Sequence, residues 1–313
     1  MSAPDVGAPV YRQGASPRPS DFRRHLAQSR CHGDFRVTRQ IAPEHFQAFR
    51  RLLEESCGIL LGDNKQYLVT SRLGSLMARE GLADLGALVQ RMQRPVESSL
   101  RGQVIEAMTT NETSWFRDIY PFANLQQRIF PELAAAGQRR IRIWSAACSS
   151  GQEPYSVSIA LQELKARGVA LDADILATDL SPSMVATTKS GIYNESAIRR
   201  GLSPERLQRY FEKVANGWQV RPEVRGRVRA QTHNLLESFS GLGRFELILC
   251  RNVLIYFSPQ TREDILRRMC RQLNPGGYLI VGASESLSRH MDDLEMIRGE
   301  NGVMYRRRHT VPV

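Results

Sequence analysis

Apolar side chains recur at helical spacing through the first third of the chain, after a polar beginning. Residues 1–40 carry prolines, glycines and scattered arginines, and they predict a mobile N-terminal tail that buries little. From Pro43 the apolar residues fall on one side of a helix that ends at Gly58, and further amphipathic helices are expected at 63–80, 84–92 and 97–108. No strand pattern interrupts them, so residues 41–110 predict a small all-helical domain.

The second half of the chain alternates between strand and helix patterns. Short apolar strands are expected at 141–144, 173–177, 245–250 and 278–282, helices at 154–165, 182–189 and 259–272, a turn at 274–277 and a closing hairpin at 294–307. This alternation predicts an α/β fold with a mainly parallel, doubly wound sheet over residues 138–313. Between 191 and 231 short β-like runs around Asn216-Gly217 and Gly226 break the alternation and predict a small inserted antiparallel β-subdomain.

Residues 111–137 join these two parts as an interdomain segment and helix. Its beginning, within MTTNETSWFRDIYPF at 108–122, concentrates polar and aromatic side chains. Binding sites often form at such junctions. A structural alternative is that Thr113 or Ser114 caps a helix running through Leu133, with Trp115 and Phe116 packed beneath it.

The stretch IRIWSAACSSGQEPYSVSIAL at 141–161 predicts a strand, a turn of small residues and the start of a helix. Small side chains let a ligand approach the backbone, next to a helix N-terminus. The turn has one glycine and no following lysine, which excludes the usual dinucleotide and phosphate-loop motifs. Glu153 would repel a phosphate but suit an ammonium group. An ordinary strand-to-helix turn, with Glu153 as a favourable first-turn acid, remains open.

Polar residues also follow the other predicted parallel strands. Asp179 ends the second strand, and residues 251–256 follow the strand at 245–250. Ligands of doubly wound sheets bind beyond the carboxyl ends of the strands, where an acid in the position of Asp179 can accept hydrogen bonds from both hydroxyls of a ribose. The alternative is that Asp179 serves only the helix that begins at Pro182.

Composition and charge narrow the class of protein. The content of 42% hydrophobic and 24% charged residues is ordinary for a soluble globular protein, and no apolar run is long enough to span a bilayer, so we expect a cytoplasmic protein. Five cysteines without a C-x-x-C pair predict neither a disulfide framework nor a metal site.

The net charge of +11 favours an acidic partner. Two basic surfaces stand out: a stripe formed by Lys65, Arg72 and Arg79, and the region 191–231, with nine lysines and arginines against four acids. A solvated helix face is the alternative interpretation of the stripe.

Five stretches occur in the order TTNETSWFRD, WSAACSSGQEPYS, ATDLS, HNLL and CRNVLIYF, followed by NPGGYLIVGASE. With this order and spacing the chain resembles, over about residues 41–308, the CheR family of S-adenosylmethionine (SAM)-dependent methyltransferases, which esterify glutamates on chemotaxis receptors. The resemblance implies a Rossmann-like class I methyltransferase sheet with an inserted antiparallel β-subdomain and an N-terminal all-helical domain. The hydrophobic pattern predicts the same divisions.

The resemblance also implies roles for individual residues. Asn111, Thr113 and Arg117 would line the cofactor and substrate cleft, Ala147 would give close backbone contact, Glu153 would hold the methionine ammonium group, and Asp179 would bind the ribose. Asn234 and Leu235 would frame the adenine, and Asn252 and Val253 would lie beside the sulfonium. Arg117 and Tyr256 are the residues expected nearest the reacting carboxylate. Cys148 and Gln152 depart from residues often seen in the cofactor turn, but neither removes a required charge.

The implied function is methylation of chemoreceptor glutamates for sensory adaptation, with S-adenosylhomocysteine (SAH) as the product. The partner would be the acidic helical cytoplasmic region of a receptor, and the enzyme would act as a monomer without nucleic acid or membrane insertion. The loop EKVANGWQ at 212–219 looks shorter than in relatives that bind a C-terminal receptor pentapeptide, so we expect activity independent of that peptide.

Other functions remain as alternatives. A methyltransferase acting on nucleic acid would suit the positive charge, but residues 252–256 read NVLIY where N-P-P-[YF] is expected for exocyclic amines. Methylation of another protein remains open. A non-catalytic SAM-binding module would be expected to lack Glu153, Asp179 or Arg117, and all of these are present.

Overall fold

The computed structural model describes residues 41–285, 287, 293–299 and 302–309, so the predicted tail at 1–40 lies outside the described residues. The first described part is helical. Its elements are α1 (Pro43–Cys57), η1 (Asp63–Lys65), α2 (Gln66–Arg79), α3 (Leu85–Met92), η2 (Pro95–Glu97) and α4 (Ser98–Met108). The predicted all-helical domain is confirmed.

Local signals fix the ends of these helices. Pro43 occupies the first turn of α1, and Gly58 ends that helix in the left-handed conformation, with its N–H donating to Glu54 O at 2.7 Å. The Asp84 carboxylate caps α3 by accepting from Ala87 N at 2.9 Å. The apolar faces of the four α-helices pack into one core that includes Phe49, Leu73, Leu88 and Val104.

The interdomain segment does not form the structural alternative considered from the sequence, a helix capped at Thr113 or Ser114. Residues 109–119 form loop and turns, and the helical run starts later as α5 (Tyr120–Asn124), η3 (Leu125–Ile129) and α6 (Phe130–Ala135). The reason is local, because Phe116, Asp118 and Ile119 have positive φ angles that a right-handed helix cannot contain. Trp115 is buried as expected, but its indole N–H donates to Ala197 O at 3.1 Å.

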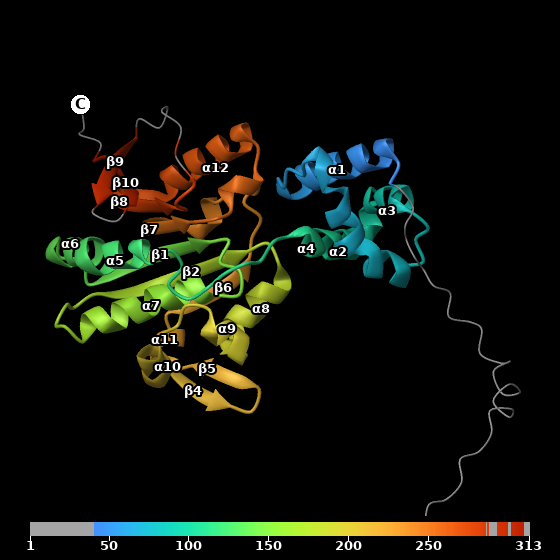
Figure 1. Cartoon of the computed structure of the whole chain (residues 1–313). Helices are drawn as coiled ribbons and strands as arrows, with labels where there is room; N and C mark the ends of the chain where they lie inside the picture. The colour runs from blue at the N-terminus through green and yellow to red at the C-terminus, as the bar shows by residue number, and fades with distance from the viewer. Residues whose placement is uncertain (1–40, 286, 288–292, 300–301, 310–313) are drawn as a thin grey trace, which may run out of the picture. The chain divides into compact units, whose positions relative to one another are not determined.

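A seven-stranded sheet forms the second part of the molecule (Figure 1). The strand order is β6-β2-β1-β7-β8-β10-β9. The first five of these strands pair in parallel, and β10 and β9 pair antiparallel at one edge. The bounds are β1 (Arg140–Ala146), β2 (Asp172–Asp179), β6 (Val228–Thr232), β7 (Phe245–Cys250), β8 (Leu273–Val281), β9 (Leu294–Gly299) and β10 (Gly302–Arg307). The predicted doubly wound sheet and the closing hairpin are confirmed.

Both faces of the sheet are buried, because successive side chains of a strand point to opposite faces. In β1, Ile141 and Ile143 enter one core with α7 (Gln152–Lys165), while Trp144 and Ala146 enter the other core with α12 (Pro259–Gln272). Figure 1 shows α7 and α12 on opposite sides of the sheet. Side chains of α5, η3 and α6 enter the same core as α7, and α8 (Pro182–Ser190) contacts β2 and β6.

The inserted subdomain contains a three-stranded antiparallel sheet in the order β3-β5-β4. Its elements are β3 (Ile192–Tyr193), α9 (Glu195–Arg199), α10 (Pro204–Tyr210), β4 (Phe211–Val214), β5 (Gly217–Val220) and α11 (Pro222–Arg225). The predicted boundary at 231 is too late, because β6 belongs to the large sheet, where it pairs in parallel with β2 from Ile175↔Val228 to Asp179↔Thr232. That pairing covers an edge of β2 that would otherwise be open.

The predicted turn at 274–277 also differs. Leu273 already pairs with Phe245, and the next paired residues are Leu247 and Tyr278, so the intervening residues bulge from within β8. The Asn274 amide donates to the Glu246 carboxylate at 2.5 Å, which fixes this bulge against the start of β7.

Candidate functional site

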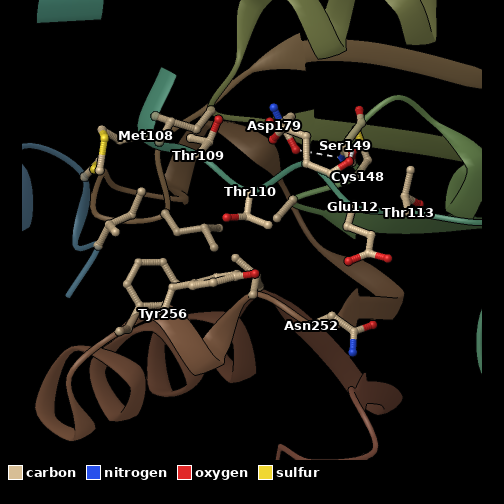
Figure 2. A pocket seen from close by; sticks show the side chains of 18 of the residues that line it. Met108, Thr109, Thr110, Glu112, Thr113, Cys148, Ser149, Asp179, Asn252 and Tyr256 are labelled. Atoms are coloured by element: carbon tan, nitrogen blue, oxygen red, sulfur yellow. Dashed lines mark hydrogen bonds between the residues drawn. The ribbon is translucent and has the colours of Figure 1, made fainter. Parts of the chain in front are cut away.

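A cavity of about 300 Å³ lies beyond the carboxyl ends of β1, β2 and β7 (Figure 2). This is the edge where doubly wound sheets bind ligands. All the site residues expected from the sequence line this one pocket: Asn111, Thr113, Arg117, Ala147, Glu153, Asp179, Asn234, Leu235, Asn252, Val253 and Tyr256. Residues of the helical part, among them Cys57, Leu60 and Met108, complete its wall.

The turn after β1 brings backbone to the pocket surface. Ala147 and Ser149 have φ angles of 57° and 50°, and Gly151 has 94°. A Cβ atom at Gly151 would lie 2.8 Å from Thr188 Oγ1 and 2.9 Å from Tyr193 Oη, so only glycine fits there. Burial raises the pKa of the Cys148 thiol well above its ordinary value, so Cys148 acts here as a small neutral side chain.

Asp179, at the end of β2, is bound to the same turn. Its Oδ2 accepts from Ser149 N at 2.7 Å (Figure 2), and its Oδ1 accepts from Ser181 N at 2.9 Å. The residue is buried, and burial raises the pKa of its carboxyl, while the backbone donors act in the opposite direction. Each carboxylate oxygen can accept more than one hydrogen bond, so capacity remains for a pair of ligand hydroxyls.

Glu153, in the first turn of α7, belongs to a charge cluster around the buried Arg251. Its Oε1 accepts from Ser145 Oγ at 2.7 Å, and its Oε2 accepts from Arg251 Nη1 at 2.9 Å. Arg251 Nη2 donates to Asp118 Oδ2 and to Arg117 O, both at 2.8 Å, and the arginine side chain is only 1% exposed. One positive group thus faces two carboxylates, so the cluster keeps a net negative charge that suits an ammonium group.

Arg117 and Tyr256 approach the pocket from different segments. Arg117 is half-buried, and its Nη1 donates to Glu112 O at 2.9 Å. Tyr256 closes η5 (Leu254–Tyr256), and its carbonyl accepts from Leu60 N at 2.8 Å. Figure 2 shows Tyr256 and Asn252 on one side of the pocket, across from Asp179 and Ser149.

Unusual backbone conformations gather around this cavity. Within the described part of the chain, the non-glycine residues with positive φ are Phe116, Asp118, Ile119, Ala147, Ser149 and Asn252. They lie in the interdomain segment, in the turn after β1 and in the loop after β7, and each of these segments lines the pocket. Local strain of this kind clusters at functional sites.

The side chain of Asn234 fixes its own loop. Its Nδ2 donates to Ser56 O at 2.8 Å, and its Oδ1 accepts from Leu236 N at 3.1 Å. The amide is therefore engaged with α1 and with its own backbone, and Leu235 presents an apolar, buried side chain beside it.

The basic stripe expected at Lys65, Arg72 and Arg79, which lie on η1 and α2, does not form one exposed surface. Arg72 Nη1 donates to Met108 O at 2.8 Å and to Thr109 O at 3.1 Å, and Lys65 and Arg72 both line the pocket. Arg79 donates to Gln103 Oε1 at 2.8 Å. The three residues of the stripe recur every seven residues, but Arg72 points toward α4 and the interdomain segment, where it contacts Met108 and Thr109.

Comparison with known proteins identifies the chain. Residues 44–109 match the family described as CheR methyltransferase, all-alpha domain, and residues 111–303 match CheR methyltransferase, SAM binding domain. The chain belongs to the CheR methyltransferase family. Chemotaxis protein methyltransferase 1 of Pseudomonas aeruginosa is 53% identical to it over 83% of this chain and 97% of the relative. Chemotaxis protein methyltransferase Cher2 of Pseudomonas putida is 51% identical, over 83% and 96%.

A more distant CheR relative has the same extent. Chemotaxis protein methyltransferase of Escherichia coli is 33% identical over 83% of this chain and 90% of the relative. Residues 44–303 therefore carry both family domains, and the chain is a SAM-dependent methyltransferase of the chemotaxis class. In the described residues no helix combines the length and apolar character needed to cross a bilayer.

Sequence reasoning left Arg251 of this CheR protein without a role. The structure buries its guanidinium between Glu153 and Asp118, at the centre of the site's charges. The one signal in the sequence was an arginine directly after an apolar strand, where a charge must lie at the carboxyl edge of the sheet.

Proposed function

We propose that this protein transfers the methyl group of SAM to glutamate side chains in the cytoplasmic region of chemoreceptors. The observation that carries the proposal is the pair of carboxylates, Glu153 and Asp179, in one pocket with Arg117. Two acids suit a ligand with an ammonium group and ribose hydroxyls, and they would repel phosphates. The arginine suits an anionic second substrate.

The residues present fit SAM. The net negative cluster around Glu153 would accept the ammonium group, and the free acceptor capacity of Asp179 would accept the ribose hydroxyls. Leu235 offers an apolar contact for the adenine, and Ala147, half-buried in the pocket wall, would let the ligand approach its backbone closely. Asn111, Thr113, Asn252 and Val253 would line the remainder of the ligand.

When bound, SAM supplies an electrophilic methyl group: a carboxylate oxygen forms the new C–O bond while the C–S bond breaks and its electron pair stays on sulfur. A glutamate side chain with its ordinary pKa near ~4.3 is already ionised at neutral pH, so the protein needs no general base. Its own residues would orient the carboxylate and exclude water, which can supply ~7 to 11 kcal/mol of the barrier. Arg117 would orient the carboxylate, and the Tyr256 hydroxyl would donate one hydrogen bond to it.

The function named in the relatives and the charge of this chain support a chemoreceptor as the substrate. Those relatives are chemotaxis protein methyltransferases, and this chain carries a net charge of +11 that suits an acidic receptor region. In the subdomain, Val214 pairs with Gly217, so only Ala215 and Asn216 connect β4 to β5. We propose that this short turn supports methylation without a tethering receptor pentapeptide.

Mass spectrometry of a receptor fragment tests the substrate. The full chain is incubated with SAM and the cytoplasmic fragment of a chemoreceptor, and we expect peptides that have gained one methyl group on glutamate. A fragment with those glutamates changed to alanine is the control. Methyl groups found on lysine, arginine or nucleic acid would contradict the proposed substrate.

A second experiment tests independence from the peptide. Receptor fragments with and without their last five residues should be methylated with the same KM, and calorimetric titration of the free pentapeptide should give no binding at micromolar concentration. Micromolar binding, or a higher KM for the shortened fragment, would overturn this part of the proposal and leave the methyl transfer intact.

A further inference from the structure

Glu285 lies just beyond β8, behind the pocket wall. The residue is 4% exposed. Its carboxylate accepts from three backbone N–H groups: Oε2 from Gly282 at 2.7 Å and from Asn252 at 2.8 Å, and Oε1 from Ile255 at 3.2 Å. Two of these donors belong to the loop after β7, so a single side chain ties that loop to the end of the neighbouring strand.

The loop needs such support because its backbone is unusual. Asn252 has a φ of 58°, which non-glycine residues seldom adopt, although asparagine tolerates it best. The chain then turns through Val253 into the short η5. In this conformation the N–H groups of Asn252 and Ile255 both reach the Glu285 carboxylate, which therefore stabilises it relative to loop conformations that lack these bonds.

Gly282, directly after β8, leaves the space in which the Glu285 carboxylate and the Asn252 backbone lie. A Cβ atom at Gly282 would lie 2.5 Å from Glu285 Oε2 and 3.0 Å from Asn252 N. The carboxylate and the loop backbone therefore fill the volume that a side chain at 282 would occupy, and only glycine is compatible with it.

The same loop carries part of the pocket wall. Asn252, Val253 and Tyr256 all line the cavity. Glu285 is not among the lining residues and contacts the loop through the backbone N–H groups of Asn252 and Ile255. On the other side, Tyr256 O accepts from Leu60 N of the helical part. The loop is thus held between two anchors, and Glu285 provides the one that belongs to the sheet.

We propose that Glu285 is a positioning residue for methyl transfer: its carboxylate sets where Asn252 and Tyr256 stand in the pocket. The inference rests on the proposed function, because the consequence for turnover assumes that transfer occurs in this pocket. The three backbone N–H groups donate to both carboxylate oxygens of Glu285, so both oxygens must act as acceptors. A glutamine of the same size would keep one oxygen and turn an NH₂ group toward a backbone N–H.

The test compares Glu285→Gln with Glu246→Gln in the full chain. Glu246 is a matched control, because it also joins neighbouring strands, accepting from Arg142 N at 2.7 Å and from the Asn274 amide, but at the amino end of β7. Glu285→Gln should lower kcat by roughly tenfold to a hundredfold, the effect of a misplacement near 1 Å, and should change the KM for SAM much less. Glu246→Gln should keep kcat within about twofold of the wild type.

Amide hydrogen exchange of the peptide spanning 250–258 provides a readout that needs no receptor. In Glu285→Gln exchange should become faster in this peptide and stay unchanged in the peptide spanning 172–179 of β2. Native exchange in 250–258, native kcat, or an equal loss of kcat in Glu246→Gln would each overturn the role of Glu285. If the wild type forms no methyl ester, the proposed function fails, and the exchange comparison still decides whether Glu285 holds the loop.

Discussion

Charged side chains in the pocket are linked to one another before any ligand arrives. Arg251 holds Glu153 and Asp118, and Ser145 holds the other oxygen of Glu153. The buried pair Arg251 and Glu153 keeps its geometry because each group has a fixed partner, and removal of one partner would leave an uncompensated buried charge. The ligand would therefore meet a preorganised arrangement with little reorganisation to make.

Asp179→Asn tests the cofactor site by replacing one carboxylate oxygen with an NH₂ group. The variant keeps one acceptor for the turn but loses the charge and an acceptor oxygen, so SAM and SAH should bind about 1.5 to 3 kcal/mol more weakly by isothermal titration. Asp174→Asn is the control, because Asp174 lies near the amino end of the same strand and forms a partly exposed ion pair with Arg140. Native affinity in Asp179→Asn would contradict the assignment of the ribose site.

Arg117→Ala should lower kcat far more than it lowers the affinity for SAM, because its guanidinium would act on the substrate carboxylate. Loss of a hydrogen bond to a charged group, about 1.5 to 3 kcal/mol, corresponds to roughly a tenfold to 150-fold drop in kcat. Arg117→Lys should restore only part of the lost kcat, because the ammonium group of lysine lacks the planar, two-pronged donor geometry of the guanidinium. Arg199→Ala on α9, where the side chain is 78% exposed, is the control. A native rate of receptor methylation in Arg117→Ala would refute the catalytic role.

At the scale of elements, α4 and α8 are joined by one carboxylate. Glu106 on α4 accepts from Ser181 Oγ at 2.7 Å and from Ser183 N at 3.2 Å at the start of α8. Hydrogen bonds from Ser183 and Ser181 hold the pKa of Glu106 below its ordinary value of 4.5. The ionised carboxylate therefore stabilises the fold above about that pH, and its contribution disappears as the pH falls through the folded-state pKa.

Glu106→Gln should lower the free energy of unfolding by about 1 kcal/mol at pH 7, as expected for a partly exposed cap. The difference from the wild type should shrink when the pH is lowered below 4.5. Urea unfolding across this range measures it, with Glu55→Gln on the exposed face of α1 as the control. If the wild type and Glu106→Gln have the same free energy of unfolding at pH 7, or if their difference persists unchanged in acid, this role of Glu106 is contradicted.

The elements that could be predicted from the sequence are those with local signals. Pro43 and Gly58 mark α1, and Ser258 with Pro259 marks the start of α12, so these bounds follow from neighbouring residues. The pairing of β6 with β2 could not be predicted in this way. It joins residues 175–179 to residues 228–232, which are far apart in the sequence. The bulge in β8 depends in the same way on the register with β7.

The candidate site likewise has features that could be predicted from the sequence and features that could not. Asp179 and residues 251–256 could be predicted as site residues because they follow predicted strands. The family resemblance alone implied roles for Asn111, Thr113, Arg117, Asn234 and Leu235, and the structure gathers both groups in one cavity. The link between Arg251 and Glu153, and the link between Glu285 and the loop at Asn252, depend on which strands lie side by side. The inward turn of Arg72 likewise depends on packing against α4.

At the scale of the whole molecule, the helical part and the sheet share the pocket. Asn234 Nδ2 donates to Ser56 O, Leu60 N donates to Tyr256 O, and a Cβ at Gly58 would lie 2.6 Å from the ring of Phe257. The cavity wall is therefore completed only when both family domains are present. This shared wall would exclude water from the reacting carboxylate.

The most direct test of the account is transfer of an isotopically labelled methyl group from SAM to a chemoreceptor fragment, followed by mild alkali. Esters hydrolyse in base, whereas methyl groups on nitrogen or carbon remain. The account predicts that the label becomes bound to the receptor and that alkali releases it as volatile methanol, with Arg117→Ala strongly reduced. Receptor-bound label that resists alkali, or no transfer from a wild-type protein that binds SAM, would contradict the central claim.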